Sequence, residues 1–225
     1  MLNKKLLLLT YILFLNLQSQ ELETLSYSHL NQGSIEVITD LHSNFVEDRN
    51  LEVWLPPNFN PESNYDLLIM HDGQNLFDGT KTWNKQEWKL DEWASKLIPE
   101  KKVKPFIIVG IYNSGENRWN DYFPENAYDF VNDKRYIDNN KPELYANAYL
   151  EYIVNELIPF IKVKYLRSKD DFETVIGGSS MGGLISMYAV FEYPEIFDAA
   201  ICMSTHWTGA FVINNNPLPL SLIHI

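Results

Sequence analysis

A serine with a glycine two residues before it and another two residues after it is the first candidate for chemistry in this chain of 225 residues. Gly178, Ser180 and Gly182 lie between a short apolar run and an apolar stretch of helical length. The G-x-S-x-G pattern is typical of a nucleophile elbow, in which a strand turns sharply into a helix and exposes the serine hydroxyl. Ser180 is therefore the candidate nucleophile, because Ser179 lacks a glycine two residues later. A glycine-rich packing turn is the alternative.

A second loop contains a glycine directly after another apolar run and reads HDGQNLFD, His71–Asp78. Backbone N–H groups in such a loop can stabilise the negative charge that develops on a carbonyl oxygen under attack. We predict an oxyanion hole made by the backbone N–H groups of Gln74 and Met181, with Gly73 beside them. An ordinary turn capped by a side chain of the loop is the alternative.

Two further loops carry candidate substrate-binding residues. Arg118, Asp121 and Tyr122 follow an apolar run and are placed in a substrate cleft, although an Arg118–Asp121 ion pair that only fastens the loop is slightly favoured. His206 and Trp207 follow the last apolar run. Trp207 is predicted either as an aromatic wall of the cleft or as a packed lid residue.

Alternating apolar runs and helical patterns predict the elements that position these loops. The predicted strands are Ser34–Asp40, Leu51–Leu55, Tyr65–Met70, Phe106–Ile111, Glu173–Ile176 and Ala199–Met203, and the predicted helices are Trp88–Leu97, Leu144–Val163 and Gly183–Phe191. Such alternation favours an α/β fold with a mostly parallel central sheet and helices on both faces. Because no helical pattern separates the first two strands, that edge is predicted to be antiparallel. In such sheets the functional groups gather at the carboxyl ends of the strands.

The two ends of the chain differ from the rest. Residues 1–20 have two lysines, an apolar run and then small or polar residues, which predicts a cleaved secretory signal and an exported protein of the bacterial periplasm or medium. An uncleaved membrane anchor is the alternative, but 12 apolar residues are fewer than the roughly 20 that a span needs. We interpret residues 220–225, LSLIHI, as translated adaptor from DNA library preparation, with a native apolar strand as the alternative.

Composition excludes several classes of function. The 18 basic and 30 acidic residues give a net charge of −12, which argues against non-specific binding to nucleic acid or to anionic membranes. The single cysteine cannot form an intrachain disulfide or a Cys-based zinc site. We expect no metal and no organic cofactor. Apolar residues make up 45% of the chain, enough for one folded domain over residues 21–225.

Three motifs in order resemble the family named "Putative esterase" (esterase D-like) of the α/β-hydrolases: HDGQNLFD, Asn113–Pro124 (NSGENRWNDYFP) and Gly177–Phe197. Its relatives include enterochelin, feruloyl and acetylxylan esterases. The resemblance implies an α/β-hydrolase sheet, Ser180 as the nucleophile of a Ser/acid/His triad, and oxyanion donors at Gln74 and Met181.

The chain departs from this family after Trp207. The resemblance places the triad acid and histidine several tens of residues further on, whereas only residues 208–225 remain. We therefore expect the chain to be truncated at its C-terminus and to lack the last strands. His206 lies at the correct edge of the sheet but precedes the position of the triad histidine, so it is the weaker candidate for the base.

These observations predict an exported serine carboxylesterase that acts on a small-molecule or glycan ester, such as an acylated carbohydrate or a hydroxycinnamoyl ester. Trp83, Trp119 and Trp207 permit an aromatic substrate. Alternatives are a siderophore esterase of the enterochelin type, an acyltransferase, and an inactive glycan-binding protein on a hydrolase scaffold. No stable membrane insertion is expected after signal cleavage, and the sequence does not indicate an oligomeric state.

Overall fold

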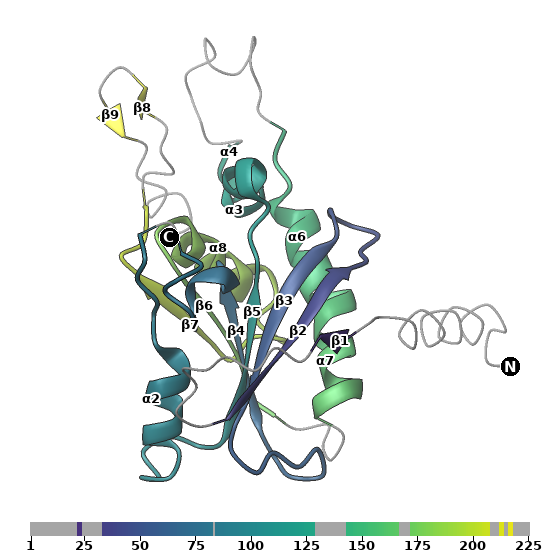
Figure 1. The fold of residues 1–225 in the computed structure, drawn as a ribbon. Coiled ribbons are helices and arrows are strands. Elements are labelled where there is room, and N and C mark those ends of the chain that lie inside the picture. The colour runs from purple at the N-terminus through teal and green to yellow at the C-terminus, as the bar shows by residue number, and fades with distance from the viewer. Residues whose placement is uncertain are drawn as a thin grey trace, which may run out of the picture.

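A twisted sheet of seven strands runs through the centre of the molecule (Figure 1). The computed structural model describes residues 22–23, 33–82, 84–128, 143–166, 172–207, 212–213 and 216–217. The predicted signal peptide, the segment 220–225 and Trp83 lie outside the described residues.

The strand order in the sheet is β1-β2-β3-β5-β4-β6-β7. The strands are β1 (Leu22–Glu23), β2 (Ser34–Leu41), β3 (Arg49–Leu55), β4 (Asp66–His71), β5 (Phe106–Ile111), β6 (Thr174–Ser179) and β7 (Ala199–Met203). The first three strands and β5 pair in antiparallel fashion, whereas β5, β4, β6 and β7 pair in parallel. The predicted antiparallel edge is thereby confirmed. The short strands β8 (Val212–Ile213) and β9 (Asn216–Pro217) pair only with each other.

Helices cover both faces of the sheet, as predicted. Alternate residues of a strand point to opposite faces, so Ile107 and Val109 of β5 join the larger core cluster while Ile108 joins the smaller one. The larger cluster packs against α6 (Ala146–Tyr152), α7 (Ile158–Tyr165) and α8 (Met181–Glu192), and the smaller against α2 (Leu90–Leu97). The short helix η1 (Gly73–Asn75) follows β4. Three further short helices follow β5 in turn: η2 (Gly115–Asn117), α3 (Arg118–Tyr122) and α4 (Glu125–Tyr128).

The element bounds agree closely with prediction at β5 and β7 and less well elsewhere. The strand predicted over Glu173–Ile176 runs on to Ser179, because its last residues include two glycines that carry no apolar signal. The helix predicted over Leu144–Val163 contains a π-helical turn, η3 (Ile153–Leu157), between α6 and α7. Pro159 follows this turn and has no N–H to continue the hydrogen-bond ladder, which accounts for the local change of helix type.

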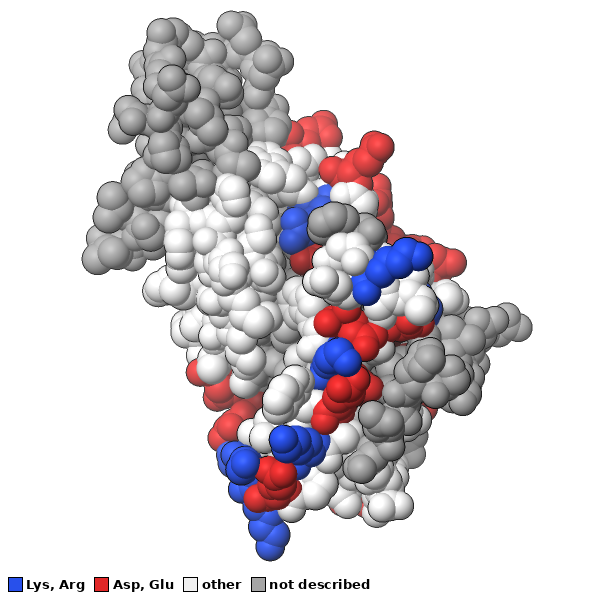
Figure 2. Space-filling model, turned by 60° about the vertical axis from the view of Figure 1, so that its left-hand side comes forward, with Lys and Arg blue, Asp and Glu red and all other residues white. Residues whose placement is uncertain are grey.

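Surface charge is mixed in sign despite the acidic total. On the face shown in Figure 2, Lys and Arg alternate with Asp and Glu along one strip, next to a broad uncharged area. No helix among the described residues is long and apolar enough to cross a membrane. The edge strand β7 exposes the apolar side chains of Ile201 and Met203.

One acidic side chain is buried in the antiparallel part of the sheet. Glu52 of β3 is only 2% exposed, and the Tyr112 hydroxyl donates to its carboxylate over 2.6 Å. Burial raises the pKa of Glu52 to about 7, the hydrogen bond from Tyr112 opposes this shift, and Asp78 adds to it. Lys81, which is partly exposed, lies 3.3 Å from the same carboxylate but does not offset the cost of burial.

This raised pKa predicts a pH-dependent stability. Between the ordinary pKa of about 4.5 and the folded pKa of about 7, the folded chain keeps a proton that the unfolded chain releases. The contribution of Glu52 to stability is therefore largest below this window and decreases by about 3 kcal/mol as pH rises through it. Urea unfolding at several pH values should show this slope in the wild type and a flatter one in Glu52→Gln. The exposed control Glu100→Gln should keep the wild-type slope, and an unchanged slope in Glu52→Gln would contradict the assignment.

Candidate active site

The turn from β6 into α8 holds the candidate nucleophile. Ser180 has φ 59° and ψ −118°, a conformation that a residue with a side chain rarely adopts. Its N–H donates to the Met203 carbonyl over 2.9 Å, and its own carbonyl accepts N–H bonds from Leu184 and His206. β7, α8 and the segment after β7 therefore hold this backbone conformation from three sides.

The glycines around Ser180 differ in what they allow. A Cβ atom on Gly178 would lie 2.7 Å from the carbonyl carbon of Gly182, so no side chain fits there. A Cβ on Gly182 would lie 3.4 Å from Asp72 and His71, an ordinary contact distance. Close backbone approach therefore requires glycine at Gly178, whereas the position of Gly182 leaves room for a Cβ atom.

The Ser180 hydroxyl has no hydrogen-bond partner among the described residues, and its residue is partly exposed. His206 lies next to it, but the bond that joins them runs from the His206 backbone N–H to the Ser180 carbonyl over 3.1 Å. Trp207 is 37% exposed at the same edge of the sheet. The site thus presents a serine at the carboxyl ends of β6 and β7, and an exposed tryptophan follows β7 in the chain.

The loop after β4 forms the second part of the site. Gly73 begins η1 and packs on β5, since a Cβ there would lie 2.4 Å from the carbonyl carbon of Gly110. Gly73 is buried, so its role in the structure is this close packing rather than an exposed contact. Gln74 follows it, and the Gln74 side-chain oxygen accepts the Asn113 N–H over 3.3 Å. Within the described residues, the Asn75 N–H of η1 donates to the Asp72 carbonyl over 2.9 Å, whereas the Gln74 and Met181 N–H groups have no hydrogen-bond acceptor.

Asp72 connects these loops through a partly buried ion pair. Its carboxylate receives two bonds from the Arg118 guanidinium, at 2.6 and 2.7 Å, and one from the Asn113 side chain at 2.7 Å. The prediction of an Arg118–Asp121 pair is therefore wrong, because Arg118 reaches the end of β4 instead. Asp72 precedes η1 but its side chain makes no capping bond to it, so Asp72 does not cap the turn in the way that the alternative requires. It adopts the left-handed conformation, with φ 58°.

The sequence predicts that Asp121 and Tyr122 line a substrate cleft. The structure buries both side chains instead. They are 2% and 0% exposed, respectively. Asp121 instead accepts a 3.0 Å bond from the buried Arg49 side chain and a short bond from the Ser114 hydroxyl. Burial raises the pKa of Asp121, and the Ser114 bond and the Arg49 charge oppose that shift. The turn of α3 directs both residues inward, which the loop sequence does not reveal.

His71 is a buried member of the core. It is 0% exposed, and its Nδ1 lies 2.9 Å from the Tyr149 hydroxyl. Burial lowers the pKa of His71 to about 4; the Asp72 charge opposes the shift and the Arg118 charge adds to it. The imidazole is thus neutral at pH 7, in agreement with a structural role for this histidine.

The sequence does not predict the hydrogen bonds and ion pairs that Asp72, Asn113 and Arg49 make in this region. The only sequence signal is that each of the three has a charged or amide side chain close to the end of a strand. Their partners lie up to 72 residues away in the chain, so the sequence does not indicate which residues pair. No group of three or more His, Cys, Asp or Glu side chains that could hold a metal occurs in the described part of the chain.

The matching family and the relatives of known activity are esterases. A family described as "Putative esterase" matches residues 43–215. The uncharacterized protein YjcH of Bacillus subtilis is 24% identical over 161 residues, covering 71% of this chain and 57% of its own length. An endo-1,4-beta-xylanase/feruloyl esterase of Xylanibacter ruminicola is 24% identical over 173 residues, covering 75% of this chain and 21% of its own length. The chain thus spans little more than half of the first relative.

Among solved structures, the enterochelin esterase of Shigella flexneri superposes with a TM-score of 0.58 at 16% identity. The superposition covers 88% of this chain and 42% of that protein. At this identity the likeness shows the fold, which is that of α/β-hydrolases.

The glycine contacts predict an asymmetric response to alanine. Gly178→Ala should cost about 2–3 kcal/mol of stability, because its methyl group meets backbone atoms that cannot rotate away. Gly182→Ala, the matched control, should cost much less. Urea unfolding of the two variants measures the difference, and equal losses would contradict the geometry.

The Asp72–Arg118 pair predicts a second asymmetry. Arg118→Ala leaves the Asp72 carboxylate, only 5% exposed, without its bidentate partner and should cost about 3 kcal/mol. Lys104→Ala removes one partner of the exposed Lys104–Glu173 pair and should cost less than about 0.5 kcal/mol. Unfolding free energies test both, and a neutral Arg118→Ala would show that the pair does not fasten the loop.

Proposed function

The chain belongs to the family described as "Putative esterase", and we propose that it hydrolyses carboxylic esters through an acyl-enzyme on Ser180. The observation that carries the proposal is the conformation of Ser180 at the carboxyl end of a parallel strand, enforced by the Gly178–Gly182 contact. A strained backbone that the surroundings hold in place is typical of functional sites.

The proposed reaction has two steps. A histidine accepts the proton of the Ser180 hydroxyl while the oxygen attacks the ester carbonyl, and the backbone N–H groups of Gln74 and Met181 stabilise the resulting oxyanion. The tetrahedral intermediate expels the alcohol, which takes the proton from the histidine, and leaves an acyl group on Ser180. Water then attacks the acyl group by the same route and releases the carboxylic acid.

The base and acid of this mechanism are proposed to lie outside the described residues. In support, no described side chain bonds to the Ser180 hydroxyl, and His71 is buried in the core. His206 is the alternative base, since its backbone already contacts Ser180.

We further propose export and a substrate of the acylated-carbohydrate or hydroxycinnamoyl type. The name of the Xylanibacter relative, which joins xylanase and feruloyl esterase, supports this substrate class. The enterochelin esterase among the structural neighbours keeps a siderophore ester as the second candidate. Parallel assays with methyl ferulate and a catecholate trilactone distinguish the two.

The proposal predicts that Ser180→Ala abolishes hydrolysis of p-nitrophenyl acetate, with a loss of at least about 10³-fold in kcat. Ser179→Ala is the matched control, since it removes a hydroxyl from the adjacent residue, and it should keep most of the activity. The assay uses both the chain of 225 residues and the product of the native gene read past Pro219.

Comparing the 225-residue chain with the native gene product tests where the base lies. Activity of the native gene product alone supports a base beyond the described residues, whereas Ser180-dependent activity of the 225-residue chain that His206→Ala removes supports His206. Activity that survives Ser180→Ala would overturn the acyl-enzyme.

A further inference from the structure

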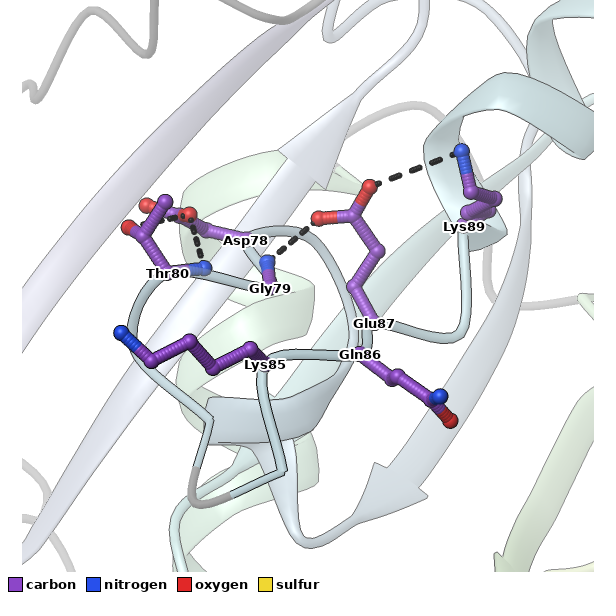
Figure 3. A pocket seen from close by; sticks show the side chains of 7 residues that line it. All are labelled: Asp78, Gly79, Thr80, Lys85, Gln86, Glu87 and Lys89. Carbon is purple, nitrogen blue, oxygen red and sulfur yellow. Dashed lines mark hydrogen bonds and ion pairs between the residues drawn. The ribbon is translucent and has the colours of Figure 1, made fainter.

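A cavity of about 580 Å³ opens in the loop between η1 and α2. It is lined by residues 78–80, 85–87 and Lys89, which Figure 3 shows from close by. We propose that this cavity binds a neutral, polyhydroxylated group of the substrate, namely a sugar ring of the alcohol part of the ester. The inference rests on the proposed function, because it supplies that reaction with a second subsite.

The position of the cavity supports this role. The loop leaves η1, which carries Gln74, and returns to it where the Trp88 N–H donates to the Asn75 carbonyl over 3.0 Å. Glu87 and Lys89 of the cavity wall are the neighbours of Trp88 in the chain, and Trp88 packs against the smaller core cluster. The cavity is therefore fixed to the short helix that offers one of the two proposed oxyanion donors, the Gln74 N–H.

Internal hydrogen bonds shape the loop. The Gly79 N–H donates to the Glu87 carboxylate over 2.5 Å, and the buried Thr82 hydroxyl donates to the Gly79 carbonyl over 3.0 Å. Lys85 and Lys89 both adopt left-handed backbone conformations, with φ 56° and 57°. Residues with side chains seldom adopt this conformation, so these two positions restrict the path of the loop around the cavity.

The chemistry of the wall favours a neutral ligand with hydroxyl groups. Two lysines face two carboxylates, those of Asp78 and Glu87, so either an anion or a cation would meet like charge. Within the described residues, the Lys85 ammonium and the Gln86 side-chain amide make no hydrogen bond, and they supply free donors and one acceptor. Figure 3 shows Lys85 extending on the side of Thr80, whereas Glu87 lies between Gly79 and Lys89. A hydroxyl can donate to the carboxylates and accept from the lysines.

The test is an NMR titration of the 225-residue chain with xylotriose as the probe. We expect saturable shifts of backbone amides in residues 78–89 with a Kd in the mM range. The variant Lys85→Asn/Gln86→Ala should bind about tenfold more weakly, because asparagine tolerates the left-handed backbone but lacks the ammonium. The single variant Gln86→Ala, which leaves the loop backbone unchanged, should show a smaller loss.

Lys101→Asn is the matched control, since Lys101 is an exposed lysine with φ 55° beyond the other end of α2. It should bind xylotriose as the wild type does. Absence of saturable shifts, equal binding by all variants, or shifts caused by inorganic phosphate rather than by xylotriose would overturn the proposal.

The titration measures binding without turnover, so its result is independent of ester hydrolysis. If Ser180→Ala abolishes esterase activity but xylotriose does not bind, only the subsite fails. If xylotriose binds but no esterase activity depends on Ser180, the proposed function fails instead.

Discussion

Ser180 is held in a conformation that its own side chain disfavours, and much of the surrounding structure provides the contacts that hold it. Its N–H is fixed by β7, its carbonyl by α8 and by the segment after β7, and the turn itself is possible only because Gly178 lacks a side chain. The cost of such a backbone, of order 1–3 kcal/mol, is met by the packed sheet on which the turn lies. The parallel strands β4, β6 and β7 thus serve to place one hydroxyl at their carboxyl edge.

Two ion pairs, one buried and one partly buried, connect the segments around this edge. Asp72 and Arg118 join the loop after β4 to the loop after β5, and Arg49 and Asp121 join β3 to α3. Each pair links residues far apart in sequence, so it forms only when the sheet has its full order. In a site that must hold N–H groups at fixed positions, such pairs restrict how far the loops can move relative to Ser180.

The sheet could be predicted from the sequence because buried strands such as Phe106–Ile111 are continuous apolar runs. The Ser180 turn could be predicted because it follows a known motif, in which Gly178 has a steric cause. The last three residues of β6 could not be predicted, because two of them are glycines and give no apolar signal. The π-helical turn before Pro159 could not be predicted either, because it leaves no periodic pattern in the sequence. The partner of Arg118 was mispredicted since a neighbour in sequence, Asp121, competed with Asp72, which lies 46 residues earlier. Polar pairing across a sheet depends on strand order, which local patterns do not contain.

Covalent labelling of Ser180 tests the acyl-enzyme most directly. The product of the native gene would be incubated with a fluorophosphonate, digested, and its peptides mapped by mass spectrometry. An acyl-enzyme on Ser180 predicts one adduct, on Ser180, that disappears in Ser180→Ala and persists in Ser179→Ala. An unlabelled protein, or an adduct on another residue, would contradict this mechanism.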